Sequence, residues 1–97
     1  MHITETKVFK SQRDFIVRYI AKDKRKAAIK FTKELKKSIN NLANFPYKCS
    51  TSNYYENKNI RDMTLKSYSI IYRVKENEKL IEILEIFNKN LPITKED

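Results

Sequence analysis

The chain has 97 residues, enough for one domain, which we expect to span residues 1–97. It contains no glycine, so the glycine-rich turns that bind nucleotides or expose a catalytic serine are excluded. His2 is the only histidine and Cys49 the only cysteine, which excludes an internal disulfide and leaves no cluster of zinc ligands. We therefore expect no cofactor and no metal.

The net charge of +9 is concentrated in the first half of the chain. Residues 1–50 hold thirteen basic and four acidic residues, whereas residues 51–97 hold eight of each. A basic half favours a polyanionic partner, such as nucleic acid, a ribosome or an acidic protein segment. There is no signal-peptide pattern and no apolar run of about 18 residues, so we expect a cytoplasmic protein that does not enter a membrane.

The N-terminal part predicts a short edge strand and then a helix. The strand is expected within residues 1–5, and Thr6 is placed to cap a first helix that runs from about Lys7 to Ala21. Apolar residues recur at helical spacing and predict its buried face: Val8, Phe9, Phe15, Ile16, Tyr19 and Ile20, with Val17 outside the pattern.

A second helix is predicted to start after Asp23, as its N-cap, and to end at Phe45-Pro46, because the residue before proline avoids the helical region. Two stripes lie about 180° apart around this helix. One is apolar and consists of Ala28, Phe31, Leu35, Ile39 and Leu42. The other consists of Lys26, Lys30, Lys33 and Lys37, and is either a solvated face or a docking surface for phosphates or an acidic partner.

After a polar loop, three runs predict strands over residues 60–65, 68–74 and 80–87. Their short joins allow only an antiparallel meander. Apolar residues at both odd and even positions of the last run predict a central strand covered on both faces, with Glu82 and Glu85 on opposite sides. The predicted fold class is α+β: an N-terminal edge strand, an αα-hairpin and a three-stranded meander.

Cationic and phenolic side chains lie on or near these strands. Tyr68 and Tyr72 are expected to face the core rather than to act as catalysts. Arg73 needs an anionic partner, either Asp62 or Glu85 in a structural salt bridge or a bound anion. Lysine, tyrosine and arginine together are able to cleave RNA without histidine, but their spacing here singles out no such site.

The order of elements resembles the RelE/ParE superfamily of bacterial type II toxins. The resemblance covers about Thr6 to Pro92 and rests on three groups of residues. These are Tyr19-Ile20-Ala21 and Ala27-Ala28 leading to Phe45-Pro46; Ile60-Arg61 and the run Tyr68-Ser69-Ile70-Ile71-Tyr72-Arg73-Val74; and Ile81-Glu82-Ile83-Leu84. RelE-like nucleases often carry an arginine and a glycine where this chain has Ser69 and Ser67, so the chain is more similar to the ParE-like members.

The resemblance implies a growth-inhibiting toxin of a plasmid-stabilising module, neutralised by a cognate antitoxin and acting by binding DNA gyrase. The alternatives are a ribosome-dependent mRNA endonuclease and a non-toxic basic binding module. If the chain is a ribonuclease, Arg61, Lys66, Arg73 and Lys89 are its candidate catalytic residues. The candidate partner-binding residues are Lys26, Lys30, Lys33, Lys37, Arg61 and Arg73.

Overall fold

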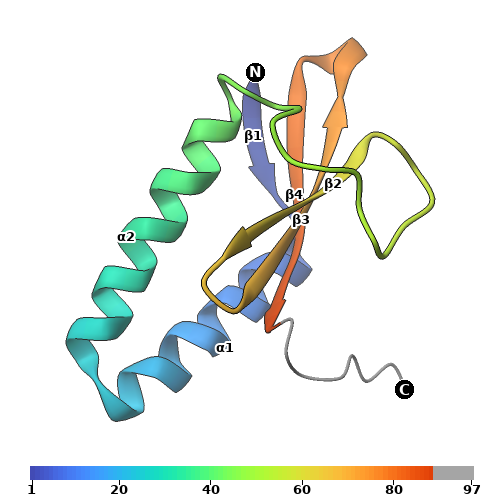
Figure 1. Cartoon of the computed structure of the whole chain (residues 1–97). Helices are drawn as coiled ribbons and strands as arrows, with labels where there is room; N and C mark the ends of the chain where they lie inside the picture. The colour runs from blue at the N-terminus through green and yellow to red at the C-terminus, as the bar shows by residue number, and fades with distance from the viewer. Residues whose placement is uncertain (89–97) are drawn as a thin grey trace.

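The computed structural model describes residues 1–88. Two helices pack against one face of a four-stranded sheet (Figure 1). The elements in chain order are β1 (His2–Glu5), α1 (Lys7–Asp23), α2 (Arg25–Leu42), β2 (Ile60–Leu65), β3 (Tyr68–Lys75), the 3₁₀ turn η1 (Glu76–Glu78) and β4 (Leu80–Asn88). The predicted α+β fold is confirmed, and the three strands of the meander end within one residue of their predicted bounds.

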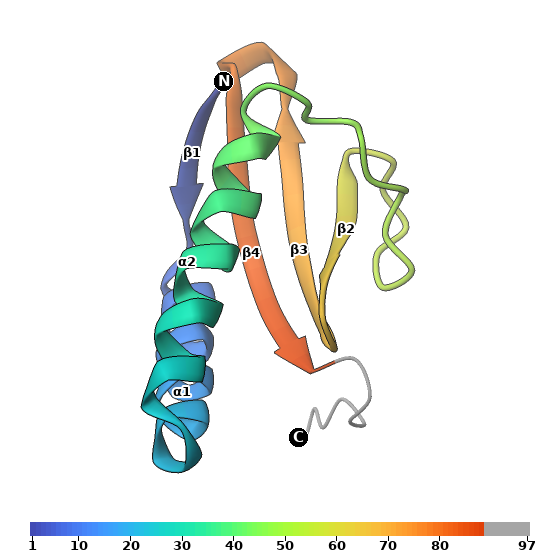
Figure 2. The ribbon, with the colours of Figure 1, turned by 60° about the vertical axis from the view of Figure 1, so that its left-hand side comes forward.

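The sheet has the order β1-β4-β3-β2, which places β4 in the interior, as predicted (Figure 2). β2, β3 and β4 pair antiparallel, which confirms the meander. β1 is an edge strand, also as predicted, but it pairs in parallel with β4. The sequence did not predict this direction. A parallel pair needs a long crossover connection, and here the helices and the first two strands of the meander supply it.

Thr6 caps α1, as predicted, and also ties the helix to the sheet. Its Oγ1 accepts a hydrogen bond from the backbone N–H of Phe9 at 3.0 Å and donates one to the carbonyl of Leu84 at 2.8 Å. A threonine cap stabilises a helix by about 1 kcal/mol. The second bond fixes where α1 begins along β4.

The predicted cap of the second helix is wrong. α1 continues two residues past Ala21, through Asp23, and the N-cap of α2 is Lys24, which makes no side-chain cap bond. Lys24 has an extended backbone, and its N–H donates to the carbonyl of Ile20. Because Asp23 belongs to the last turn of α1, the two helices meet across a single residue.

α2 presents the two opposite faces that its sequence predicts. Its apolar stripe is buried: Ala28, Phe31, Leu35, Ile39 and Leu42. The helix ends at Leu42, earlier than the predicted end at Phe45-Pro46. Beyond Leu42 the N–H groups of Ala43 and Asn44 bond back three residues, to the carbonyls of Asn40 and Asn41. The helix therefore stops after its last core-facing residue, before proline acts.

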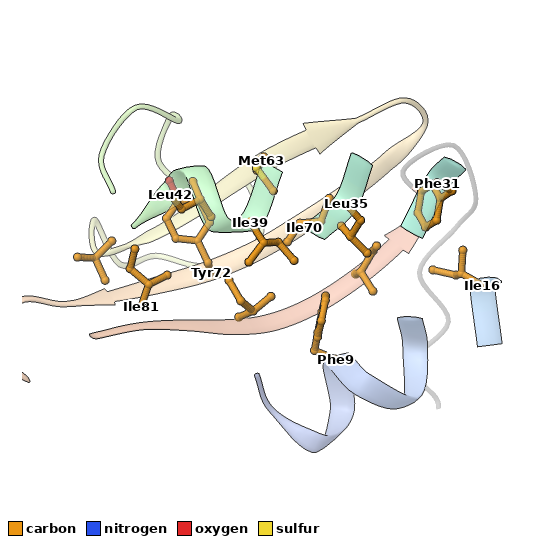
Figure 3. Close-up of a cluster of buried hydrophobic side chains, with 13 residues drawn as sticks. Phe9, Ile16, Phe31, Leu35, Ile39, Leu42, Met63, Ile70, Tyr72 and Ile81 are labelled. Carbon is orange, nitrogen blue, oxygen red and sulfur yellow. The ribbon is translucent and has the colours of Figure 1, made fainter. Parts of the chain in front are cut away.

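The core lies between the helices and the inner face of the sheet (Figure 3). Leu35 and Ile39 from α2 and Phe9 from α1 pack with Ile70 and Tyr72 of β3. The Tyr72 ring is fully buried, and its hydroxyl donates to the carbonyl of Pro46 at 2.8 Å. Tyr68 is partly buried, and its ring lies 5.1 Å from that of Phe31. Both tyrosines thus face the core, as predicted.

The predicted apolar face of α1 is only partly correct. Phe9 and Ile16 are buried, but Val8, Phe15 and Tyr19 are 56%, 64% and 67% exposed. Val17, predicted to lie outside the pattern, packs against the core. The helix therefore carries a second, exposed apolar strip that simple spacing merged with the buried one.

A β-bulge in β4 overturns the interpretation of that strand. Ile71 pairs with Glu85 and Tyr72 pairs with Ile83, so Leu84 is an extra residue without a partner on β3. The bulge changes which positions point inward. It explains buried isoleucines at both odd and even positions without full cover on both faces. It also places Glu82 and Glu85 on the same face of the sheet, contrary to the prediction.

Both turns of the meander use a lysine where glycine is usual. Lys66, between β2 and β3, and Lys79, before β4, have φ of 55° and 53°. A residue with a Cβ in this left-handed region costs about 1 kcal/mol relative to glycine.

Changing Lys79 to glycine is therefore expected to stabilise the protein by about 1 kcal/mol, measured as the free energy of unfolding in urea. Glu78→Gly is the matched control, because Glu78 is the neighbouring exposed residue and its φ is not positive. We expect that change to destabilise the protein by up to about 1 kcal/mol. Equal destabilisation by both changes would contradict the account of this turn.

Candidate partner-binding site

An apolar groove lies where α1 crosses the ends of β3 and β4. It has a volume of about 680 Å³ and is lined by Ser11, Gln12, Phe15, Ile16, Tyr19, Tyr68, Ile86, Phe87 and Asn88. Phe15 and Tyr19 project from α1 on one side, four residues apart, and are mostly exposed. Exposed aromatic rings beside a groove are typical of a protein-docking surface.

Local structure holds the groove in shape. The side-chain oxygen of Gln12 on α1 accepts a hydrogen bond from the backbone N–H of Ile86 on β4 at 2.8 Å, which joins the two sides. The Tyr54 ring packs edge-on against Phe87 at 5.1 Å. Burial, and to a lesser degree the neighbouring Tyr19, raise the pKa of Tyr68, which favours the neutral phenol. The groove is thus a fixed apolar surface suited to binding.

The lysine stripe of α2 lies on the opposite side of the helix from the core, as predicted. Lys26, Lys30, Lys33 and Lys37 are all exposed, and none of them forms an ion pair within residues 1–88. The nearest acidic residue along this face, Glu34, pairs instead with Lys66 at 3.2 Å. The stripe therefore keeps its positive charge.

Arg61 is committed to holding the loop that follows α2. Its Nη1 donates to the carbonyls of Cys49 at 2.7 Å and Tyr47 at 3.5 Å, and its guanidinium lies 4.9 Å from the centre of the Tyr47 ring. Tyr72 bonds the same loop through Pro46. Both side chains point to the helix side of the sheet, since Arg61 and Tyr72 are paired across β2 and β3. The geometry gives Arg61 a structural role.

The other strand cations point elsewhere. Arg73 lies on the outer face, and its Nη1 is 3.9 Å from a carboxylate oxygen of Glu82, which is also 3.7 Å from Nζ of Lys75. The partner of Arg73 is thus Glu82. The prediction that its partner is Asp62 or Glu85 was wrong. Lys66 sits at the far tip of the β2–β3 hairpin, and Lys89 lies outside the described residues. The structure does not bring Arg61, Lys66 and Arg73 together.

Tyr55 and the backbone of Asn53 tie the loop to the outer face of the sheet. The Tyr55 hydroxyl donates to Oε2 of Glu85 at 2.5 Å. This bond, with burial, raises the pKa of Tyr55 to about 12. The N–H of Asn53 donates to Oδ2 of Asp62 at 2.9 Å. The carboxylates of Glu85 and Asp62 thus act as anchors for the loop.

Comparison with known proteins decides the family. A family model described as the ParE toxin of the type II toxin-antitoxin system parDE matches residues 4–90. The chain belongs to the ParE toxin family.

The fold agrees with that of a solved structure. A structure titled as the chromosomal ParDE TA system from P. aeruginosa superposes with a TM-score of 0.71 at 23% identity, over 91% of this chain and 95% of that one. Among curated proteins, none matches this chain. The likeness to the solved structure supports the fold, and the family match supports a toxin of a type II toxin–antitoxin module with an antitoxin partner.

The apolar groove of this ParE toxin was not predicted from the sequence. The sequence nevertheless held a signal that Phe15 and Tyr19 are exposed. These large apolar residues stand close to the charged residues Arg13, Asp14 and Arg18. A helix packed on one face does not bury an apolar arc as wide as the one predicted for α1.

Within residues 1–88, no helix is long and apolar enough to cross a bilayer.

Proposed function

We propose that this ParE toxin inhibits DNA gyrase by binding and is neutralised by an antitoxin that occupies the apolar groove. Binding is favoured over catalysis because the basic side chains of the strands point to different parts of the fold. Arg61 and Arg73 lie on opposite faces of the sheet and already have partners. Phosphate cleavage needs several such groups around one phosphorus atom, and the described residues offer no such convergence. This favours the gyrase-directed members over the mRNA endonucleases.

The groove carries the antitoxin part of the proposal. An amphipathic helix binds such a groove through side chains three and four residues apart. Phe15 and Tyr19 provide a matching pair of anchors on α1. The net charge of +9 attracts an acidic segment and raises its association rate, while the apolar contacts slow its release.

Purified gyrase tests the toxin's target directly. The full chain is added to a supercoiling reaction at rising concentration, and a ribosome-dependent mRNA cleavage assay is run beside it. We expect loss of supercoiling or trapped cleaved DNA, relieved by the product of the reading frame adjacent to the toxin gene, and no mRNA cleavage. Unchanged supercoiling together with cleaved mRNA would overturn the proposal in favour of the endonuclease.

A further inference from the structure

The outer face of α2 is a strongly basic surface whose four lysines have no ion-pair partner in the described part of the chain. α2 carries six basic residues, Arg25, Lys26, Lys30, Lys33, Lys36 and Lys37, against the single acidic residue Glu34. Glu34 is occupied by Lys66. The helix lies on the outside of the helix layer (Figure 2), and none of the four stripe lysines forms an ion pair within residues 1–88. Its charge is left for an external anion.

The spacing of the stripe fits a regular array of negative charges. Lys26 and Lys37 are eleven residues apart, so the stripe extends about 16 Å at about 1.5 Å per residue. Duplex DNA carries one negative charge about every 1.7 Å along its axis. Four lysines in one line thus meet several phosphates at once, whichever register the helix takes.

The composition of this face favours nucleic acid over protein. Lysine is depleted in the cores of protein interfaces, which depend on large apolar anchors. Beside the stripe, Ile29 is the one exposed large apolar side chain of α2 within residues 1–88. Phosphate contacts, in contrast, are made by lysine and arginine without apolar anchors. The anchors of this protein lie in the groove on α1, on another surface.

We infer that α2 binds the phosphate backbone of duplex DNA through Lys26, Lys30, Lys33 and Lys37, without sequence preference. The choice of DNA over RNA rests on the proposed function, since a toxin that arrests gyrase works beside duplex DNA. The inference goes further in giving the toxin its own contact with DNA, separate from the antitoxin groove. One molecule then has one surface for protein and another for nucleic acid.

The test uses the free full-length chain and a fluorescent 20-base-pair DNA duplex, with neither gyrase nor antitoxin present. Anisotropy is measured across a salt series, and a contact with four phosphates predicts a slope of about −3.6 for log K against log salt. Changing Lys26, Lys30, Lys33 and Lys37 to glutamine is expected to weaken binding at least about tenfold at low salt and to remove most of that slope.

The matched control changes four other exposed lysines, Lys7, Lys10, Lys58 and Lys79, to glutamine and so has the same net charge. It is expected to keep most of the affinity and slope. Equal loss in both variants would show that net charge alone drives binding, and would overturn the inference. Tighter binding to an RNA duplex of the same length, or equally tight binding to polyglutamate, would also overturn it. Because gyrase is absent, failure here leaves the proposed target untouched.

Discussion

Replacing Phe15 and Tyr19 together by serine is expected to weaken antitoxin binding about 100-fold or more. Both rings line the groove and are mostly exposed, so their loss removes two anchors while the fold stays intact. Truncating a central aromatic anchor of an interface typically costs about 2 kcal/mol or more. Serine leaves the net charge unchanged, which keeps electrostatic attraction out of the comparison. Binding is measured by titration calorimetry with the antitoxin, and by co-purification at moderate salt.

Val8→Ser is the matched control for the groove. Val8 is an exposed apolar residue on the same helix, but it does not line the groove. We expect antitoxin affinity to change less than about threefold, since Val8 lies outside the proposed groove. In cells, the double variant should remain toxic when the antitoxin is co-expressed, whereas Val8→Ser should be neutralised. Wild-type affinity in the double variant would place the antitoxin on another surface.

Phe9→Ala is expected to destabilise the protein by about 3–5 kcal/mol, measured by urea unfolding. Phe9 is fully buried between α1 and the sheet, so its removal leaves a cavity in the core (Figure 3). This is a large part of the stability of a domain of this size, which is typically about 5–15 kcal/mol. The variant should be partly unfolded at 37 °C.

Phe15→Ala is the control within the same helix, and it should change the free energy of unfolding by less than about 0.5 kcal/mol. Removing the ring of Phe9 is thus expected to cost much stability and removing that of Phe15 very little, because Phe9 is buried and Phe15 is exposed. Similar losses in the two variants would show that α1 packs through the wider apolar face that its sequence predicts.

Much of the fold could be predicted because local signals agreed with each other. On α2, the apolar and lysine stripes lie half a turn apart, and only one orientation buries the first and exposes the second. The strands of the meander are bounded by two short joins that force antiparallel pairing. Thr6 is a strong cap next to a clear helical pattern.

The errors arose where tertiary contacts decide between local alternatives. The bulge at Leu84 changes the face of every later residue in β4, and no residue type marks it in the sequence. The parallel pairing of β1 depends on contacts with a strand far along the chain. Lys24, with no side-chain cap bond, separates α1 from α2 although Asp23 is the better cap by residue type.

The candidate site was less predictable than the fold. The exposure of the lysine stripe followed from helical periodicity alone. The partners of Arg61 and Arg73 did not, because they depend on the path of the 43–59 loop and on the register of β4. The groove was missed for a similar reason, since it forms where α1 crosses strands distant in sequence.

Pulse-labelling of DNA and protein synthesis in one culture tests the toxin's action most directly. The full chain is induced without antitoxin, and incorporation of labelled thymidine and labelled amino acid is followed in parallel. We predict that thymidine incorporation falls first and that cells elongate while translation continues. A prompt stop in amino-acid incorporation with DNA synthesis still running, or unchanged incorporation of both labels, would contradict this account.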